Sequence, residues 1–217
     1  EYSGQLILME ELLVGSMHDV NGLFDEEGNF HPMGIVDRYF MEKHPVEKEI
    51  RTPSILKKTK QQELYVLLEH SVRALDIKWG PVKGDAILVD DKFYMFEVAP
   101  RLHGPKSSLY LLPMSGFNCL EKALNIISGK TCIDFEITQE HFTVCTAILP
   151  NPGSIFDEMK VIDSGKNSGV DECLILKKHG VTIKPYRSSS DVPAYIIASR
   201  ESYKECRFVL DEMRKSI

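Results

Sequence analysis

No run of apolar residues in this sequence approaches the roughly 20 residues that a membrane-spanning helix needs. The first residues also lack the charged and apolar regions of a secretory signal. From these two absences we expect a cytoplasmic protein without a membrane partner. Positive charge is not in excess either, since the formal net charge is −6 at pH 7. Because a general nucleic-acid-binding surface is rich in Lys and Arg, we expect no nucleic-acid partner.

Cysteine and histidine occur, but not in the groupings that build covalent or metal frameworks. The five cysteines include no CxxC pair, and the seven histidines form no pair at helical spacing. An odd number of dispersed cysteines argues against a disulfide framework and against a zinc site. We therefore expect reduced, mostly buried thiols.

No glycine-rich loop of the kind that holds phosphate groups is present. The early glycines are dispersed, at Gly4, Gly15, Gly22 and Gly28. A phosphate-binding loop needs its glycines close together at the start of a helix. The chain also begins at Glu1 rather than at a methionine and enters the apolar run 6–9 almost at once. We therefore expect that an N-terminal portion precedes it.

What is present is the composition of a soluble globular protein, with 43% of the 217 residues hydrophobic and 27% charged. Apolar, β-prone runs predict strands at residues 5–13, 19–24, 30–40, 142–149, 173–177, 181–186 and 194–198. Helical periodicity predicts helices at residues 54–75, 107–115, 117–128 and 201–215. We interpret these elements as an α+β protein of two units, residues 1–136 and a smaller β-rich domain, 137–217, closed by the last helix.

The segment 84–104, GDAILVDDKFYMFEVAPRLHG, predicts a β-hairpin, because two apolar runs flank a short polar turn. With the turn at its centre, Asp85 lies directly opposite Glu97, and Arg101 continues the same row. Carboxylates opposite each other repel across about 5 Å between Cβ atoms, so a cation is expected between them. One candidate is a divalent cation such as Mg²⁺, which carboxylates hold together with substrate phosphates. The other is a salt bridge from Lys83 or Arg101.

These motifs resemble the C-terminal half of the ATP-grasp fold, as found in biotin carboxylase, carbamoyl-phosphate synthase and carboxylate–amine ligases. The resemblance rests on MEELLVG at residues 9–15, GDAILVDDKFYMFEVAPR at 84–101 and a helix ending in Ser-Gly. The segments GDAI and EVAPRLHG are most similar to those of amino-acid-ligating enzymes and carbamoyl-phosphate-synthase-like proteins. Residues 140–217 resemble the tail domain of such ligases, so nearly the whole chain is covered. The resemblance implies an antiparallel sheet with helices on one face, followed by a small β-rich domain.

In that family an acidic residue and a Glu twelve positions later, which opens an E-x-N-x-R motif, hold the Mg²⁺ ions of MgATP. The resemblance therefore implies Asp85 and Glu97 as metal ligands, with Mn²⁺ as an alternative ion. It implies Arg101 as the residue that stabilises the transferring phosphate, and a planar guanidinium group suits phosphate oxygens. A salt bridge between Arg101 and either carboxylate stays open.

Six further residues match positions that bind ATP in the family. The segment that binds adenine, partly through its backbone, corresponds to Glu10, Glu11, Leu12 and Leu13, and the apolar contacts to the purine correspond to Ile87 and Phe96. From the residues alone, the two glutamates are interpreted first as solvent-facing charges at a strand end. Ile87 and Phe96, taken in isolation, are interpreted as core residues.

The sequence departs from the family pattern at two positions. Ala99 stands where the family commonly has Asn, and Met17 stands where it often has a Glu that binds the ribose hydroxyls. His18 and Asp19 are candidates to replace that Glu, and a surface role is the alternative for either.

His103 and Lys106 follow Arg101 in a loop. Substrate contact is one interpretation of this histidine, and an incidental loop position is the more common one.

The resemblance implies ATP- and Mg²⁺-dependent ligation of a small-molecule carboxylate to an amine through an acyl phosphate. The N-terminal lobe, which covers the phosphates in the family, is then expected in cis or in trans, and the isolated chain is expected to be almost inactive. One alternative is carboxyphosphate chemistry of the biotin carboxylase or carbamoyl-phosphate synthase kind. Another is a non-catalytic nucleotide-binding or assembly domain. The sequence leaves the oligomeric state open, including a homodimer.

Overall fold

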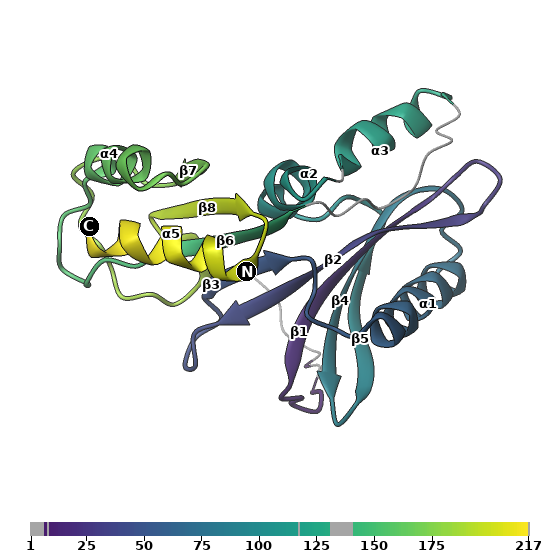
Figure 1. Ribbon diagram of the computed structural model, residues 1–217. Coiled ribbons are helices and arrows are strands. Elements are labelled where there is room, and N and C mark those ends of the chain that lie inside the picture. Colours follow the sequence, from purple (N-terminus) through teal and green to yellow (C-terminus); the bar gives the residue numbers. More distant parts are fainter. Residues whose placement is uncertain (1–6, 8, 117, 131–140, 217) are drawn as a thin grey trace.

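The computed structural model describes residues 7, 9–116, 118–130 and 141–216. Its strands form one antiparallel sheet in the order β5-β4-β1-β2-β3-β6-β8-β7 (Figure 1). The strands are β1 Ser16–Phe24, β2 Phe30–Phe40, β3 Glu47–Thr52, β4 Gly80–Val89, β5 Lys92–Ala99, β6 Phe142–Ile148, β7 Glu172–Ile175 and β8 Ala194–Arg200. The helical segments are α1 Lys58–Ala74, η1 Lys106–Leu111, α2 Leu112–Met114, α3 Cys119–Ile127, α4 Glu158–Ser168, η2 Ser189–Asp191 and α5 Tyr203–Lys215.

The predicted α+β class with an antiparallel sheet is confirmed. Within the described residues, no helix is long and apolar enough to cross a membrane. The cysteines in these ranges are free, and Cys119, Cys145 and Cys206 are buried, as expected. The predicted boundary between residues 136 and 137 falls in 131–140, outside the described residues, so the division into two units stays a prediction. The sheet itself runs continuously from one predicted unit to the other, through the pairing of β3 with β6.

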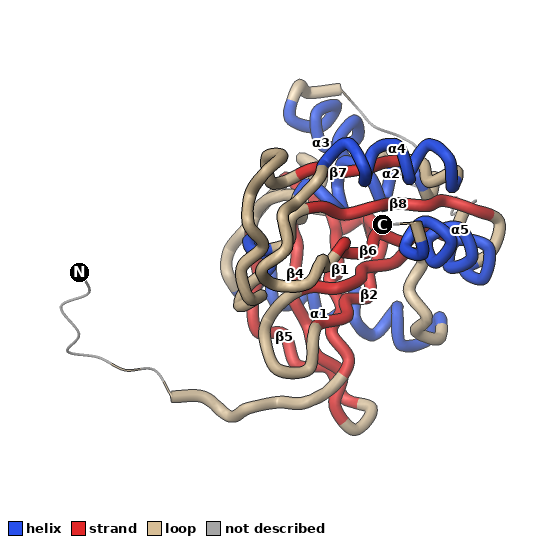
Figure 2. Tube along the Cα trace, turned by 90° about the vertical axis from the view of Figure 1, so that its left-hand side faces the viewer, coloured by secondary structure: helices blue, strands red, loops and turns tan. Residues whose placement is uncertain are grey.

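Two predicted strands are wrong in the described residues. Residues 9–13 form an exposed loop that runs outward from the start of β1 (Figure 2). Strand β1 begins only at Ser16, which pairs with Leu88, one residue before β4 ends at Val89. Residues 181–186 make only an isolated bridge, between Thr182 and Ile155. Pro185 lacks an N–H for a ladder.

Helix α1 covers one face of β1, β2, β4 and β5 (Figure 1). Leu64, Leu68 and Val72 recur every four residues and are fully buried, which is the predicted helical stripe. The helix approaches β4 closely at Gly84, where a Cβ atom would lie 3.0 Å from Leu68 Cδ1. The opposite face of β1, β2, β4 and β5 does not contact α1 and is therefore available to the polar side chains of these strands.

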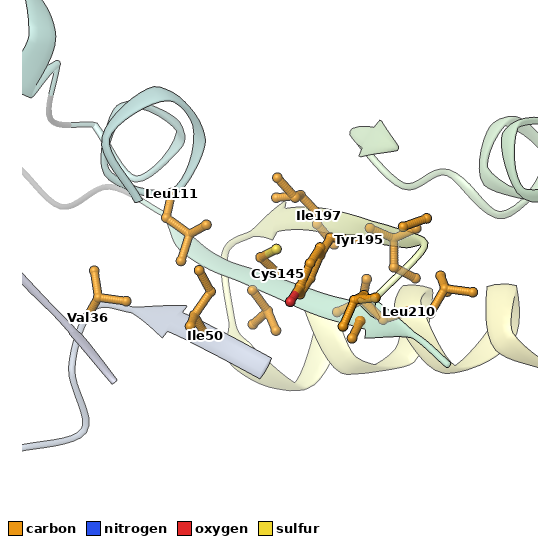
Figure 3. Close-up of a cluster of buried hydrophobic side chains, with 14 of the residues drawn as sticks. Val36, Ile50, Leu111, Cys145, Tyr195, Ile197 and Leu210 are labelled. Atoms are coloured by element: carbon orange, nitrogen blue, oxygen red, sulfur yellow. The ribbon is translucent and has the colours of Figure 1, made fainter. Parts of the chain in front are cut away.

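A second core joins β3, β6 and β8 to η1 and α5. Figure 3 shows Ile50, Leu111, Cys145, Tyr195 and Leu210 gathered in it, and all five side chains are almost fully buried. Helix α5 begins with a capping box, in which Ser202 and Glu205 each accept a hydrogen bond from the other's backbone N–H. This core fixes η1 against the sheet, and η1 carries Lys106 toward the site described below.

The Leu68→Ala variant is expected to lower the free energy of unfolding by about 2–5 kcal/mol, because it removes a fully buried side chain between α1 and β4. Urea denaturation followed by circular dichroism measures this change. Val66→Ala on the same helix is the matched control, since Val66 is 39% exposed and should change the value by about 0.5 kcal/mol or less. Equal losses in both variants would contradict the assigned packing face.

Candidate functional site

Strands β4 and β5 pair with Asp85 directly opposite Glu97, as the sequence predicts. The ladder is irregular at Phe96, because Asp85 pairs with Glu97 while the next residue, Ala86, pairs with Met95. Phe96 is thus an extra residue of β5, a β-bulge. The bulge turns Met95 toward the α1 core, whereas an uninterrupted ladder would place Met95 and Glu97 on the same face.

A third carboxylate extends this pair into a row across three strands. In the pairing of β1 with β4, Asp19 lies directly opposite Asp85. Asp19, Asp85 and Glu97 therefore form an acidic row on β1, β4 and β5. Like charges directly opposite each other destabilise a sheet, so the row needs cations beside it.

Lys83 lies between the last two members of the row. Its Nζ atom is 3.0 Å from Asp85 Oδ1 and also pairs with Glu97 Oε1, and its side chain is 2% exposed. Arg101 is more distant, with Nη2 3.9 Å from Glu97 Oε1, and its side chain is 57% exposed. The sequence left Lys83 and Arg101 as candidate cations for the Asp85–Glu97 pair, and the structure places Lys83 beside it.

Arg38 on β2 links the acidic row to a second buried ion pair. Its Nη1 atom donates to Asp19 Oδ1 at 3.1 Å and lies 3.8 Å from Asp85 Oδ2. Its Nε atom donates to Glu47 Oε1 at 2.7 Å, and Glu47 Oε2 accepts from Lys106 on η1. Glu47 is thus held between two cations at a position that is 4% exposed.

His103 closes the site from the loop after β5. Its Nε2 atom is 2.7 Å from Asp19 Oδ2 and 3.9 Å from Asp85 Oδ1. Neither carboxylate oxygen has a hydrogen-bond partner in the described part of the chain, although both are buried. The contact between His103 and Asp19 is therefore a charge contact without hydrogen-bond alignment. Asp19, Asp85 and His103 place three donor atoms within 4.8 Å of one another.

Burial and neighbouring charges shift the acidities of these groups in opposite directions. The pKa of Asp85 is raised, first by burial and then by the negative charge of Asp19, which together outweigh the pairing with Lys83. Burial also acts to raise the pKa of Glu47, but Lys106 and Arg38 overcome it, so that pKa is lowered. The pKa of Arg38 is raised despite its burial, because Asp19 and Glu47 stabilise the cation.

The Asp85→Asn variant is expected to be more stable than the wild type at pH 7. A carboxyl whose folded-state pKa is raised stabilises fully below its unfolded pKa and loses that contribution as the pH rises through the folded value. At neutral pH the ionised Asp85 therefore costs stability that a neutral amide does not. Thermal unfolding from pH 7 down to pH 3 should show the gain disappearing in acid. A less stable variant at pH 7 would contradict this assignment.

A pocket of about 510 Å³ lies where β1 begins and β2 and β4 end, beside the loop before β1. Leu13, Met17, Phe40 and Ile87 are among the side chains that line it, together with Arg38. Its wall also contains a hydrogen-bonded chain in which His18 joins Ser16, at 2.9 Å, to Asp37, at 2.7 Å. Because Arg38 lines the pocket and also contacts Asp19 and Asp85, the pocket adjoins the acidic row.

The structure brings some of the predicted site residues together and leaves others apart. Leu13 and Ile87 meet in the pocket, and Asp85 and Glu97 meet in the acidic row. Phe96 is 56% exposed and does not line this pocket. The remaining adenine-segment residues, Glu10, Glu11 and Leu12, lie on the exposed loop and do not line it either. The binding roles of all these residues, and of Arg101, stay predictions.

Sequence reasoning missed Arg38 and Glu47, and it did not place Asp19 opposite Asp85. Asp19 and Asp85 come together through the pairing of strands far apart in the chain, for which the sequence has no turn signal. The sequence does contain a signal for such contacts, namely charged residues that interrupt apolar strands. A buried charge needs a partner, so these residues indicate buried ion pairs. Asp19 and Arg38 both occupy such positions.

No protein-family model matches this sequence, and no curated protein matches it either. The structure is similar to L-amino acid ligase from Bacillus licheniformis, with a TM-score of 0.78, 23% identity and coverage of 93% of this chain and 53% of that one. It is also similar to N5-carboxyaminoimidazole synthase from Aspergillus clavatus, solved with ADP and its aminoimidazole ribonucleotide, with a TM-score of 0.69, 14% identity and coverage of 93% and 50%.

A third similar structure is the biotin carboxylase domain of 2-oxoglutarate carboxylase from Hydrogenobacter thermophilus, solved with MgADP and bicarbonate. Its TM-score is 0.60, with 13% identity and coverage of 93% of this chain and 44% of that one. The chain spans about half the length of these proteins. At these identities the likeness shows the fold, which is that of the C-terminal part of ATP-grasp proteins.

Proposed function

We propose that the protein is an ATP- and Mg²⁺-dependent ligase that joins a carboxylate to an amine through an acyl phosphate. The observation that carries the proposal is the acidic row of Asp19, Asp85 and Glu97 beside a nucleotide-sized pocket. The fold supports it, because similar structures include an L-amino acid ligase and enzymes solved with ADP or MgADP.

The residues present fit a hard divalent cation bound together with phosphates. Mg²⁺ prefers oxygen ligands and is commonly held by one or two carboxylates plus substrate phosphates. Asp85 has a buried oxygen with no aligned hydrogen bond from the described residues, and Glu97 lies opposite it with half of its side chain exposed. These two residues would hold the ion, which would neutralise the charge of the phosphates. Lys83 would then leave its place between them and pair with phosphate oxygens.

The chain's own cations would position the transferring group. Arg101 is largely exposed and only weakly paired, so it can reach a phosphate without breaking a strong ion pair. Arg38 is held in place by Asp19 and Glu47, at the boundary of the pocket and the acidic row. The adenine would occupy the apolar pocket against Leu13 and Ile87.

The proposed reaction balances in two steps. An oxygen of the substrate carboxylate attacks the γ-phosphorus of ATP, forming an acyl phosphate and releasing ADP. The amine then attacks the acyl carbon, the C–O bond to phosphate breaks, and phosphate leaves as the amine loses a proton. Phosphoryl transfer depends mainly on positioning and electrostatics, so no side-chain nucleophile is required. A further lobe, in cis or in trans, would cover the phosphates, because this chain spans about half of the similar structures.

The test is ADP release by the full-length protein with ATP, Mg²⁺ and a panel of amino acids, with bicarbonate in a separate arm. The proposal expects ADP and phosphate to appear in equal amounts only when both a carboxylate and an amine substrate are present. Release with bicarbonate instead would favour carboxyphosphate chemistry. Nucleotide binding without ADP release from any substrate would favour a non-catalytic domain, for which the present position of Lys83 is the supporting observation.

A further inference from the structure

The Asp19 end of the acidic row differs from the Glu97 end in its surroundings. Between Asp85 and Glu97 lies the ammonium group of Lys83. Beside Asp19 and Asp85 lie the guanidinium of Arg38 and the imidazole of His103. Arg38 donates to Asp19 Oδ1, and this leaves Asp19 Oδ2 on the side of His103.

Asp19 Oδ2 is an unsatisfied acceptor in the interior. Asp19 is 0% exposed, and this oxygen accepts no hydrogen bond from any described residue. Leaving a buried charged oxygen without a partner costs free energy, which native structures avoid unless an ion or a function requires it. His103 Nε2 approaches it to 2.7 Å without hydrogen-bond alignment. Asp19 Oδ2 and His103 Nε2 thus form an ion-pair contact without a hydrogen bond, and both atoms are of the kind that ligates a metal ion.

We infer that Asp19, Asp85 and His103 form a divalent-cation site with mixed oxygen and nitrogen donors, which binds its ion without nucleotide. The three donor atoms lie within 4.8 Å of one another, and His103 Nε2 is 3.9 Å from Asp85 Oδ1. Ligand distances of about 2.0–2.2 Å are reached from such positions by small side-chain rotations. The inference deepens the proposed function, on which it rests for the role of the ion beside the phosphates.

The ligand set selects a class of ion. Sites made only of carboxylates and phosphates suit Mg²⁺, whereas an imidazole ligand suits first-row transition metals. We therefore expect Mn²⁺ and Co²⁺ to bind this site in preference to Mg²⁺. The Asp85–Glu97 pair, by contrast, would hold Mg²⁺ only when phosphates supply further oxygens.

Titration of the full-length protein with Mn²⁺ in the absence of nucleotide tests the inference, with the free ion measured by electron paramagnetic resonance. Co²⁺ is the second probe, because its visible absorption reports nitrogen ligation directly. The wild type should bind about one equivalent of each ion. His103→Ala and Asp19→Asn should weaken this binding by at least about tenfold.

His179→Ala is the matched control, because His179 lies 3.4 Å from Asp157 in an exposed histidine–aspartate pair elsewhere on the chain. It should not change metal binding. Circular dichroism checks that each variant is folded, and His103→Gln replaces any His103→Ala protein that is not. Wild-type protein that binds neither Mn²⁺ nor Co²⁺ without nucleotide would overturn the inference. Binding that the His103 variants leave unchanged would overturn it as well.

The outcomes also separate this inference from the proposed function. If Mn²⁺ binds only together with nucleotide and depends on Glu97 but not on His103, the three-ligand site is wrong and the ligase proposal stands. If Mn²⁺ binds through His103 but no nucleotide binds under any condition, the site is right and the ligase proposal fails.

Discussion

The Asp85→Ala variant of the full-length protein is expected to bind nucleotide in the presence of Mg²⁺ at least about 100-fold more weakly than the wild type. Asp85 is the one carboxylate that lies opposite both other acids of the row, so its removal deprives the ion of its central ligand. Loss of a group that only supports a metal ligand already costs about 10–100-fold in affinity. Isothermal titration calorimetry with an ATP analogue, with and without Mg²⁺, measures the change.

The control for this prediction is Asp163→Ala, which removes an exposed carboxylate on α4. It should bind the nucleotide as the wild type does. If Asp85→Ala retains the Mg²⁺-dependent affinity, the acidic row is not the metal site. The ligase proposal and the carboxyphosphate alternative would then both be wrong.

The Glu47→Gln variant is expected to lose about 3–5 kcal/mol of unfolding free energy at pH 7. Glu47 is buried between Arg38 and Lys106, and removing one partner of a buried ion pair leaves the others uncompensated. Because the folded-state pKa of Glu47 is lowered, its stabilisation is present above the unfolded pKa and is lost as the pH falls through the folded value. The difference from wild type should therefore shrink in acid.

Urea denaturation between pH 7 and pH 3 measures this effect. Glu63→Gln is the control, because Glu63 pairs with Lys60 on the exposed surface of α1, where such pairs contribute about 1 kcal/mol or less. A Glu47→Gln protein as stable as the control variant would show that the buried network contributes nothing to the fold.

Local patterns in the sequence predict much of this fold. The stripe of Leu64, Leu68 and Val72 identifies α1, and the polar turn after Val89 identifies the β4–β5 hairpin. These signals lie within a few residues of one another, so no knowledge of the rest of the chain is needed. Helix α4 is the exception among the described helices. Its apolar residues are few. Its signals in the sequence are the cap residue Asp157 and Gly169, which ends the helix with a positive φ of 77°.

The candidate site is only partly predictable, because it depends on contacts between distant segments. The Asp85–Glu97 pair follows from a hairpin, whereas Asp19 and Arg38 reach it through strand pairings that no turn specifies. The assumed register also ignores the bulge at Phe96. It still pairs Asp85 with Glu97. The turn in the structure is two residues long, with Val89 opposite Lys92, which shifts the pairing by one residue from the predicted register, and the bulge shifts it back.

The choice between Lys83 and a metal ion is the part that the sequence leaves open. Both are cations that a pair of carboxylates attracts, and both fit between strands. The structure has Lys83 between the two carboxylates, with its side chain buried beside Asp85. Under the proposed function, this arrangement is the nucleotide-free state, and Lys83 exchanges its carboxylate partners for phosphates when nucleotide binds.

A crystal structure of the full-length protein with an ATP analogue and excess Mg²⁺ shows whether the acidic row holds the metal ion. We expect an ion bound to oxygens of both Asp85 and Glu97, with Lys83 turned away from Glu97 toward the phosphates. Bound nucleotide with Lys83 still between the two carboxylates and no ion at either would contradict it.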